Sequence, residues 1–409
     1  MAKVSLVRVP EKPYDDEVFG AVRGAVEMIG GAGAFAQAGQ KVLVKPNWWC
    51  WPSSTPNDPT HVIYSTTDRR MVTAAAQMFV ELGCDVMIGE DPAVNRVVRK
   101  VYDGFGAEDV ARRAGARLVD LRAGGYTTTP VPKGREFTEM RISTIALEAD
   151  LIVNLPLLKA HQLCSVTMAL KNMKGVLPPV EKRAFHQRNL SQGIADLATI
   201  VPSRLNIVDA IIAADNWVVG GGLQPTCLVI AGDDPVATDA VCCHLMKADP
   251  YAVEHILFSH ELGAGEIDLA QIDVLGEKIE DFALPFTLPA DPMTMAADLD
   301  NIDIVVGEAC SSCLNRLGNI FPKIGLEELA QSGEIAFIVG KGAEPMPGKT
   351  NILMGPCTAR HKGEGIYVAD CPPMEQDLMH AIRYIAGKET EMRYFWDGGQ
   401  VFAEDAGEE

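Results

Sequence analysis

The sequence of 409 residues is short of positive charge and has no long apolar run. Lys and Arg total 36 against 55 Asp and Glu, which gives a formal net charge of −19. Such an acidic surface repels nucleic acid and anionic lipid, because both need a positive footprint. No stretch approaches the roughly 18 uninterrupted apolar residues of a membrane span, and the opening MAKVSLVRVP lacks the apolar core of a signal peptide. We therefore expect a cytoplasmic protein without nucleic acid or membrane partners.

Short apolar runs alternate with amphipathic stretches, which predicts an α/β fold with mostly parallel sheets flanked by helices. The expected strands include KVLVKPN, DVMIGED, ADLIVNLP, LNIVDAI and CLVIAGDD. Thr67 and Asp68 are suitable N-caps for a helix over residues 69–82. In such sheets, ligands bind where the parallel strands end.

Proline concentrates in LPFTLPADPM, and we expect a domain boundary there. It would separate an α/β domain, residues 1–290, from a smaller C-terminal α/β domain, residues 291–409. The second domain should contain the strands IDIVVGEA, EIAFIVG and TNILMG and a helix over about residues 373–386.

Ten cysteines need an explanation other than disulfides, because cytosolic thiols stay reduced. Cys84, Cys242 and Cys243 sit in apolar patterns typical of a protein core. The C-terminal set differs: a CxxC pair is followed by two single cysteines, each beside proline. Four thiolates are the usual ligands of a 4Fe-4S cluster, although a four-thiolate zinc site and no metal at all remain alternatives. The predicted metal ligands are Cys310, Cys313, Cys357 and Cys371.

A basic island occupies residues 159–188, where Glu181 is the single acid. Its charged residues are mixed with apolar ones, which suits a partly buried loop better than a solvated helix face. Lysines in that setting would bind a phosphate, a carboxylate or the cluster itself. The alternative is that they are solvent-facing charges, as lysines usually are.

Two resemblances follow from these motifs. The order KPN, LKAH, ALKNMKG, VDA and DDPVATDA resembles the domain of unknown function 362 family, whose members are α/β proteins often fused to iron–sulfur modules. The segment GPCTARHKGEGIYVADCPP resembles the cluster-binding segment of NiFe-hydrogenase small subunits, which implies cluster geometry and not hydrogenase activity. The positions that match the first family are Lys45, Asn47, Lys159, His161, Lys171, Asn172, Lys174, His186, Asp209 and Asp239.

From these positions we predict His161, His186 and Lys171 as catalytic residues, with histidine suited to acid–base work near neutral pH. The predicted substrate-binding residues are Lys45, Asn47, Lys159, Asn172, Lys174 and Trp49. Asp209 and Asp239 could instead cap helices. The run Trp48, Trp49, Cys50, Trp51 departs from strand alternation, so at least one indole ring should face a cleft or an interface.

The first hypothesis for function is an iron–sulfur oxidoreductase that acts on a small anionic substrate, with a redox partner protein and with a homodimer as a candidate assembly. The alternatives are an electron-transfer or cluster-carrier protein, and a non-redox isomerase or dehydratase that uses the cluster as a Lewis acid. A flavin could be an electron partner, but GGAGAF near Gly30 is a lone glycine-rich turn.

Overall fold

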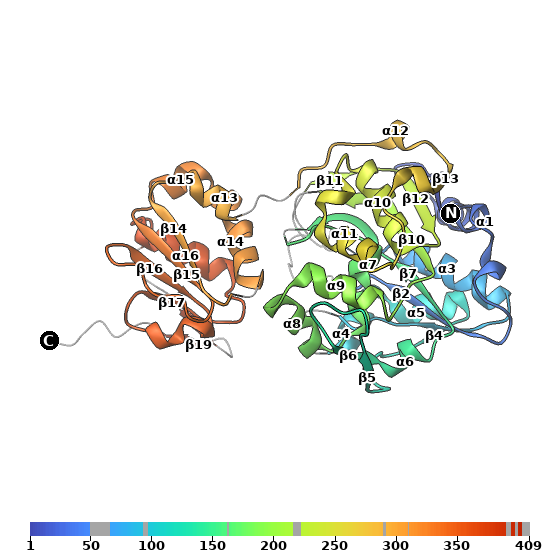
Figure 1. Ribbon diagram of the computed structural model, residues 1–409, viewed down its shortest axis with the longest axis horizontal. Coiled ribbons are helices and arrows are strands. Elements are labelled where there is room, and N and C mark those ends of the chain that lie inside the picture. The colour runs from blue at the N-terminus through green and yellow to red at the C-terminus, as the bar shows by residue number, and fades with distance from the viewer. Residues whose placement is uncertain are drawn as a thin grey trace. The chain divides into compact units, whose positions relative to one another are not determined.

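The computed structural model describes residues 1–49, 66–92, 97–161, 163–215, 222–288, 292–309, 311–389, 394–396 and 400–402. The chain forms two compact units, Met1–Leu288 and Pro289–Glu409 (Figure 1). Each unit has its own sheet and its own buried core. The mixed α/β class expected from the sequence is confirmed.

The first unit is built on a large mixed sheet with the strand order β13-β1-β12-β10-β7-β2-β3-β4. Within this path of described strands, β12 runs against its neighbours and the others run parallel to one another. The strands are β1 (Ala2–Arg8), β2 (Lys41–Pro46), β3 (Asp85–Ile88), β4 (Arg117–Leu118), β7 (Leu151–Leu155), β10 (Leu205–Ala214), β12 (Leu228–Gly232) and β13 (Ile272–Gly276).

Shorter strands extend or accompany this sheet. β8 (Leu157–His161) pairs with β10 and with β9 (Ser165–Thr167), and β11 (Leu223–Gln224) pairs with β10. A separate antiparallel pair is formed by β5 (Tyr126–Pro130) and β6 (Glu139–Ser143).

Helices cover both faces of the large sheet (Figure 1). One face packs against α1 (Asp15–Met28), α3 (Arg69–Glu81), α4 (Val98–Phe105) and α5 (Ala107–Ala114). The other face packs against α7 (Ala169–Asn172), η2 (Met173–Val176), α8 (Pro179–Gln187), α9 (Leu190–Ala198), α10 (Pro235–Leu245) and α11 (Glu254–Glu261). The remaining short helices of this unit are η1 (Ala32–Ala34), α6 (Thr144–Leu147), η3 (Pro250–Ala252), η4 (Leu269–Gln271) and α12 (Ile279–Phe282).

Local sequence explains where α3 begins. The Asp68 side chain accepts a hydrogen bond from the Arg70 backbone amide, which satisfies one of the unpaired donors of the first turn. Met71, Val72 and Phe79 are buried on the side that faces the sheet. The helix and its Asp68 cap were predicted correctly.

The second unit is a four-stranded parallel sheet in the order β14-β15-β16-β17. Its strands are β14 (Ile302–Val306), β15 (Ile335–Val339), β16 (Thr350–Met354) and β17 (Ile366–Val368). Its helices are α13 (Pro292–Ala297), α14 (Ser311–Ile324), α15 (Leu326–Ala330), η5 (Pro356–His361) and α16 (Glu375–Ile385), and a hairpin of β18 (Tyr394–Trp396) and β19 (Gln400–Phe402) follows.

The basic island differs from the loop that the sequence predicted. It is divided among β8, β9, α7, η2 and α8, which are short elements packed over the end of the sheet. Their backbone groups are hydrogen-bonded within these elements, so charged side chains can be held at low exposure. No helix in the described part of the chain is both long enough and apolar enough to cross a membrane.

Candidate functional site

The candidate site lies where the order of the strands in the large sheet changes direction. From β2 the chain continues outward to β3 and β4, and it returns to β7 on the opposite side of β2. In open α/β sheets, ligands bind in the crevice at the carboxyl ends of such neighbouring strands. Lys45 and Asn47 lie at the end of β2, and Lys159 and His161 follow the end of β7.

Five basic side chains from four elements make up what we call the cationic site. Lys159 and His161 are alternate residues of β8, so they point to the same face of that strand. Lys171 lies in α7, one residue before its end, Lys174 lies in η2, and His186 lies in the last turn of α8. All five were predicted as site residues, and the fold brings their elements together.

Burial dominates the electrostatics of the cationic site. It lowers the pKa of Lys171, and it lowers the pKa of Lys174 further with the help of the Lys171 charge. The pKa of His161 falls well below its ordinary value because of burial and then the neighbouring lysines, and the pKa of His186 falls to about 2. Among the described residues, no carboxylate pairs with Lys171, Lys174 or His161.

Two hydrogen bonds fix the histidine rings. The Leu163 backbone amide donates to His161 Nδ1 over 3.1 Å, so the proton of the neutral ring lies on Nε2. Lys174 Nζ lies 3.3 Å from His186 Nε2. His161 is therefore set up to donate a hydrogen bond from Nε2 to a bound group, because its other nitrogen is already an acceptor.

Lys45 is held differently, in a buried ion pair that we group with its neighbours as the paired site. Its ammonium lies 2.8 Å from Glu90 Oε2, and both side chains are almost fully buried. Burial lowers the pKa of Lys45 and raises that of Glu90, and the opposite charge counteracts both shifts. Its predicted role in substrate binding stays a prediction.

Gly175 explains why the ALKNMKG motif ends in glycine. A Cβ atom there would overlap Glu90 Oε1 and lie 2.5 Å from Lys45 Nζ. The Gly175 carbonyl also accepts a hydrogen bond from the Asp91 backbone amide over 3.1 Å. The motif therefore packs its backbone directly against the Lys45–Glu90 pair.

Asp91 completes the paired site. Its carboxylate accepts hydrogen bonds from Arg122 and from the Tyr126 hydroxyl, and it forms a 3.2 Å ion pair with Lys182. Burial still lowers the pKa of Lys182 to about 8. Glu90 and Asp91 were missed by sequence reasoning, since nothing in GEDP indicates which distant cations they pair with.

A buried amide network supports α7. Asn172 donates to Asn154 Oδ1 over 2.7 Å, and Asn154 donates to the Ala169 carbonyl and to Asn206 Oδ1. The Asp239 carboxylate, from α10, accepts hydrogen bonds from the backbone amides of Ala169 and Leu170. Asp239 therefore caps a helix, as the alternative proposed, but that helix is α7 and not its own.

The indole side chains separate into two environments. Trp48 is fully buried and stacks on Phe105 with ring centroids 5.3 Å apart. Trp49 is partly exposed, and the Lys159 ammonium lies 5.7 Å from the centroid of its ring. Trp49 therefore lies beside the cationic site, whereas Cys50 and Trp51 lie outside the described residues.

His255, on α11, is a further buried group that the sequence did not indicate. It is fully buried, and neither ring nitrogen has a hydrogen-bond partner among the described residues. Burial, and then the charge of Lys171, lower its pKa to about 3. Cys164 is also buried near Lys171 and Lys174, and burial raises the pKa of its thiol.

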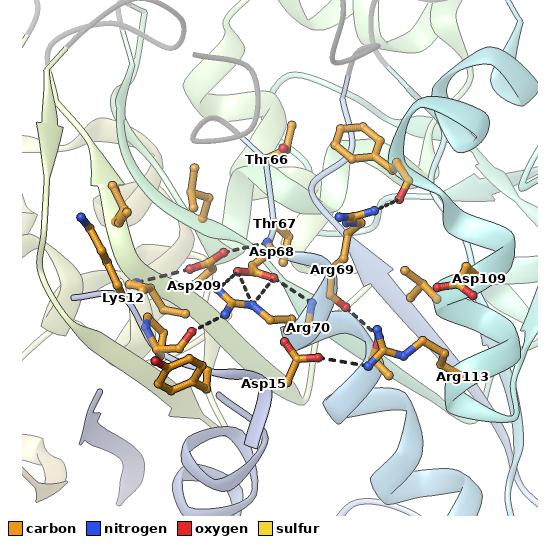
Figure 2. A pocket seen from close by; sticks show the side chains of 18 of the residues that line it. Lys12, Asp15, Thr66, Thr67, Asp68, Arg69, Arg70, Asp109, Arg113 and Asp209 are labelled. Atoms are coloured by element: carbon orange, nitrogen blue, oxygen red, sulfur yellow. Dashed lines mark hydrogen bonds and ion pairs between the residues drawn. The ribbon is translucent and has the colours of Figure 1, made fainter. Parts of the chain in front are cut away.

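A pocket of about 970 Å³ opens beside the same strand ends, on the α1–α3–α5 side (Figure 2). Asp209 and Asp68 line it, and Arg70 is held there by Asp68 and by the Pro13 carbonyl. Asp209 accepts hydrogen bonds from the Asp68 and Ile211 amides, but burial and then Asp68 raise its pKa to about 7. The acidic and basic residues that line this pocket largely neutralise one another, so the pocket does not favour a ligand of one charge.

In the second unit, the predicted ligands occur after parallel strands that end at one edge of the sheet. Cys313 lies in the first turn of α14, Cys357 in η5 after β16, and Cys371 after β17. Cys310 lies outside the described residues, although it follows β14 in the chain. Within the described part of the chain, no three His, Cys, Asp or Glu side chains form a group that could hold a metal ion.

Close backbone approaches join the cysteine-bearing segments. The Gly355 amide donates to the Val368 carbonyl over 2.8 Å, and a Cβ on Gly355 would lie 2.8 Å from the Asp370 carbonyl oxygen. Glu375, at the start of α16, forms ion pairs with Arg316 and Lys323 of α14. The Cys357 and Cys371 loops are therefore adjacent, and the helix that follows them packs on the helix that carries Cys313.

Comparison with known proteins finds a family match within the first unit. Residues 42–244 match the family described as domain of unknown function (DUF362), which confirms that resemblance. All predicted site residues from Lys45 to His186 lie within this match, and the four cysteines lie beyond it.

Individual relatives are more distant. The chain is 28% identical over 268 residues to the thylakoid-associated protein sll1697 of Synechocystis, which covers 64% of this chain and 79% of that protein. The lactate racemase apoprotein of Thermoanaerobacterium thermosaccharolyticum aligns with a TM-score of 0.39 and 12% identity over 60% of this chain. A Thermotoga maritima protein aligns with a TM-score of 0.33 and 10% identity over 62% of this chain. This chain spans 57% and 61% of the length of those two solved chains.

Proposed function

We propose that this protein is an iron–sulfur oxidoreductase that acts on a small anionic substrate bound at the cationic site. The observation that carries the anionic substrate is that neither the partly exposed Lys171 nor the buried Lys174 has a carboxylate paired to it among the described residues. An uncompensated buried cation is costly, so such a site favours an anion that supplies the missing charge.

The residues of the site suit binding and positioning of that substrate. Lys171 is partly exposed, whereas Lys159 and Lys174 are buried, so Lys171 is the lysine of the cationic site most accessible to an incoming anion. His161 would orient the substrate with the hydrogen bond from Nε2, and His186 would hold the Lys174 ammonium in place, 3.3 Å from its Nε2. Trp49 would shield the Lys159 side of the site from water.

The 4Fe-4S cluster is proposed for the second unit, and the donor set supports it. Cys313, Cys357 and Cys371 lie on adjacent segments and form no disulfide among the described residues, and Cys310 precedes α14 by one residue. A cluster held there would supply single-electron chemistry. The exposure of Cys357 and Cys371 leaves room for an inorganic group at the sheet edge and for approach of a redox partner protein.

The cluster is tested by anaerobic purification followed by iron and sulfide analysis and an EPR spectrum of the reduced protein. We expect a 4Fe-4S stoichiometry, and we expect Cys371→Ser to lower it, whereas Cys84→Ser, outside the proposed set, should leave it unchanged. Zinc in place of iron, or a colourless protein after anaerobic reconstitution, would refute the redox proposal.

The other candidate functions differ in what the cationic site must do. An electron carrier should keep its redox behaviour in His161→Ala and Lys171→Ala, whereas an enzyme should lose turnover. A Lewis-acid isomerase or dehydratase needs an iron with an exchangeable ligand, so substrate should perturb the EPR spectrum of its reduced cluster directly. A cytoplasmic location remains part of the proposal.

A further inference from the structure

The pocket of about 970 Å³ in the first unit is separate from the cationic site (Figure 2). It lies on the α1–α3–α5 face of the large sheet, whereas α7, η2 and α8 of the cationic site pack on the other face. Small-molecule sites have volumes of about 300–1,000 Å³, so this pocket can hold a molecule of two linked rings. Asp209 of β10 lines it and is level with Leu157, just past the end of β7, where open α/β sheets bind ligands.

Asp209 is the buried acid of this pocket. The residue is 4% exposed, and its two carboxylate oxygens accept hydrogen bonds from the backbone amides of Asp68 at 2.8 Å and Ile211 at 3.3 Å. A carboxylate has about four acceptor positions, so each oxygen keeps one for a further donor. Within the described part of the chain no cation forms an ion pair with Asp209, and the nearby Arg70 is paired with Asp68 at 2.6 Å.

The charge state of Asp209 favours a hydroxyl group as its partner. Burial and then the Asp68 charge raise its pKa to about 7, so the ionised and protonated forms are both present near neutral pH. An ammonium group pairs well only with the ionised form, whereas a hydroxyl both donates and accepts and pairs with either form. Because the two oxygens of a carboxyl lie side by side, two adjacent hydroxyls can bind one oxygen each.

The inner wall around Asp209 is largely apolar. Phe105, Val110, Leu157 and Ile211 are buried and line the pocket, and Ile212 lines it while partly exposed. A planar ring system suits such a wall, because its faces are apolar while its edge can stay in contact with water.

The exposed rim of the pocket carries balanced charge. Its described charged residues are three acids and three bases: Glu11, Asp15, Asp109, Lys12, Arg69 and Arg113. Arg113 and Asp15 form an ion pair at 3.1 Å. An uncharged ligand passes such a rim without a net electrostatic cost.

We propose that this pocket binds a ribonucleoside, with the 2′- and 3′-hydroxyls of the ribose on the Asp209 carboxyl and the base against the apolar wall. The same contact, an acidic side chain near a strand end on ribose hydroxyls, is used by dinucleotide-binding α/β folds. A free sugar offers the same pair of hydroxyls without the base, so the experiment distinguishes these two sources. The site is independent of the proposed function.

The test measures binding to the full-length protein by titration calorimetry. The probes are adenosine, inosine, cytidine and uridine, each with its 2′-deoxy partner, and free ribose. We expect at least one ribonucleoside to bind with a dissociation constant below about 1 mM and about tenfold or more tightly than its 2′-deoxy partner, which lacks one hydrogen bond to the carboxyl. Ribose should bind at least about tenfold more weakly than that ribonucleoside, because it lacks the base.

Two variants separate the contacts. In Asp209→Asn one oxygen becomes a donor, so the variant should bind the ribonucleoside and its 2′-deoxy partner within about threefold of each other. Ile212→Thr removes apolar surface and should weaken both by about threefold. The exposed Asp273→Asn, on β13, makes the same change of charge away from the pocket and should leave every affinity unchanged. Circular dichroism verifies folding, and if Asp209→Asn does not fold, the ligand pairs measured on wild type decide.

The outcomes that contradict the proposal are distinct. Equal affinity for both members of every nucleoside pair, or no binding of any ribonucleoside at about 5 mM, overturns it. Ribose that binds as tightly as the best ribonucleoside overturns the contact with the base and assigns the pocket to a free sugar. None of these results bears on the cluster or on anion binding at the cationic site, which are measured separately.

Discussion

The paired site and the cationic site lie in the same unit and both bury lysines, but they solve the problem of buried charge in opposite ways. In the paired site, Lys45 meets Glu90 at 2.8 Å, and Lys182 and Arg122 meet Asp91. In the cationic site, Lys171 and Lys174 have no paired carboxylate among the described residues. The net charge of −19 makes that absence selective, because acids are plentiful elsewhere in the chain.

The difference separates structural lysines from functional ones. A buried ion pair is stable only while both partners remain, so it fixes the fold and leaves no charge for a ligand. A buried cation without a carboxylate weakens the folded state and gains from an anion. Lysine therefore has two roles in the first unit, a structural one and a functional one. Which role a lysine has depends on partners that lie far away in the chain.

The largest expected effect comes from breaking the paired site. Lys45→Met leaves the Glu90 carboxylate buried and unpaired, so the free energy of unfolding should fall by about 3–5 kcal/mol. Urea denaturation followed by tryptophan fluorescence measures it. The double variant Lys45→Met/Glu90→Gln should recover part of the loss, because the stranded charge is gone. A loss below about 1 kcal/mol in the single variant would show that the Lys45–Glu90 pair is exposed to solvent, since exposed pairs contribute little to stability.

A smaller loss is expected from Gly175→Ala, which forces a methyl group onto the Lys45–Glu90 pair. Overpacking of this kind lowers the free energy of unfolding by about 1–3 kcal/mol. Gly20→Ala is the matched control, because that helical glycine has nothing within 4 Å of its added Cβ and should gain about 0.5–1 kcal/mol. Equal behaviour of the two variants in urea denaturation would contradict the contact.

The histidines of the cationic site should give a pH dependence. His186 has a pKa of about 2 in the folded protein, so as the pH falls through 6.5 the unfolded chain takes up a proton and the folded chain does not. Stability is therefore lost as the pH falls. We compare the free energy of unfolding of His186→Gln with that of wild type at each pH. The difference should favour the variant by about 1 kcal/mol more at pH 5.5 than at pH 7.5.

The variant must be compared with wild type, because Asp209 and Asp239 change the pH dependence of stability in the direction opposite to His186. Their carboxyl pKa values are raised to about 7, so they contribute stability that is lost as the pH rises from about 4 to 7. Urea midpoints of wild type and variant at the two pH values isolate the histidine. A difference that does not change with pH would show that His186 is solvated in the folded protein.

Lys171→Met should have the smallest effect on stability. Unlike Lys45→Met, it should not lower the free energy of unfolding substantially. Removal of an unpaired cation relieves its desolvation and its repulsion of Lys174, so the free energy of unfolding should stay within about 1 kcal/mol of wild type or rise. The same variant should lose anion binding by about tenfold or more in calorimetry. Loss of several kcal/mol of stability would reassign Lys171 to the structural class.

Much of the scaffold could be predicted from local pattern. The Asp68 cap, the helix after it and the strands of both units follow from short apolar runs and capping residues, which depend on neighbours in sequence. The lysines of the basic island were also found from composition alone. That Lys182 of this island meets a carboxylate could not be predicted, because Asp91 reaches it only through the fold.

The candidate site shows the same limit. His255 carries no local signal, and its place beside Lys171 comes from packing of α11. The cap that Asp239 provides to α7 is likewise a contact between residues 70 positions apart. The four cysteines were selected by spacing and resemblance, and their convergence on a cluster stays a prediction that metal analysis must decide.

The cap on α7 has a mechanical consequence. A helix of four residues cannot hold its shape alone, because one turn does not repay the entropy of forming it. The start of α7 is instead clamped by a carboxylate that belongs to α10, which is itself seated on β1 and β12. The position of Lys171 in α7 therefore depends on Asp239 of another helix. A small rotation of α10 would change the direction of the Lys171 side chain while the residues that line the site stay the same.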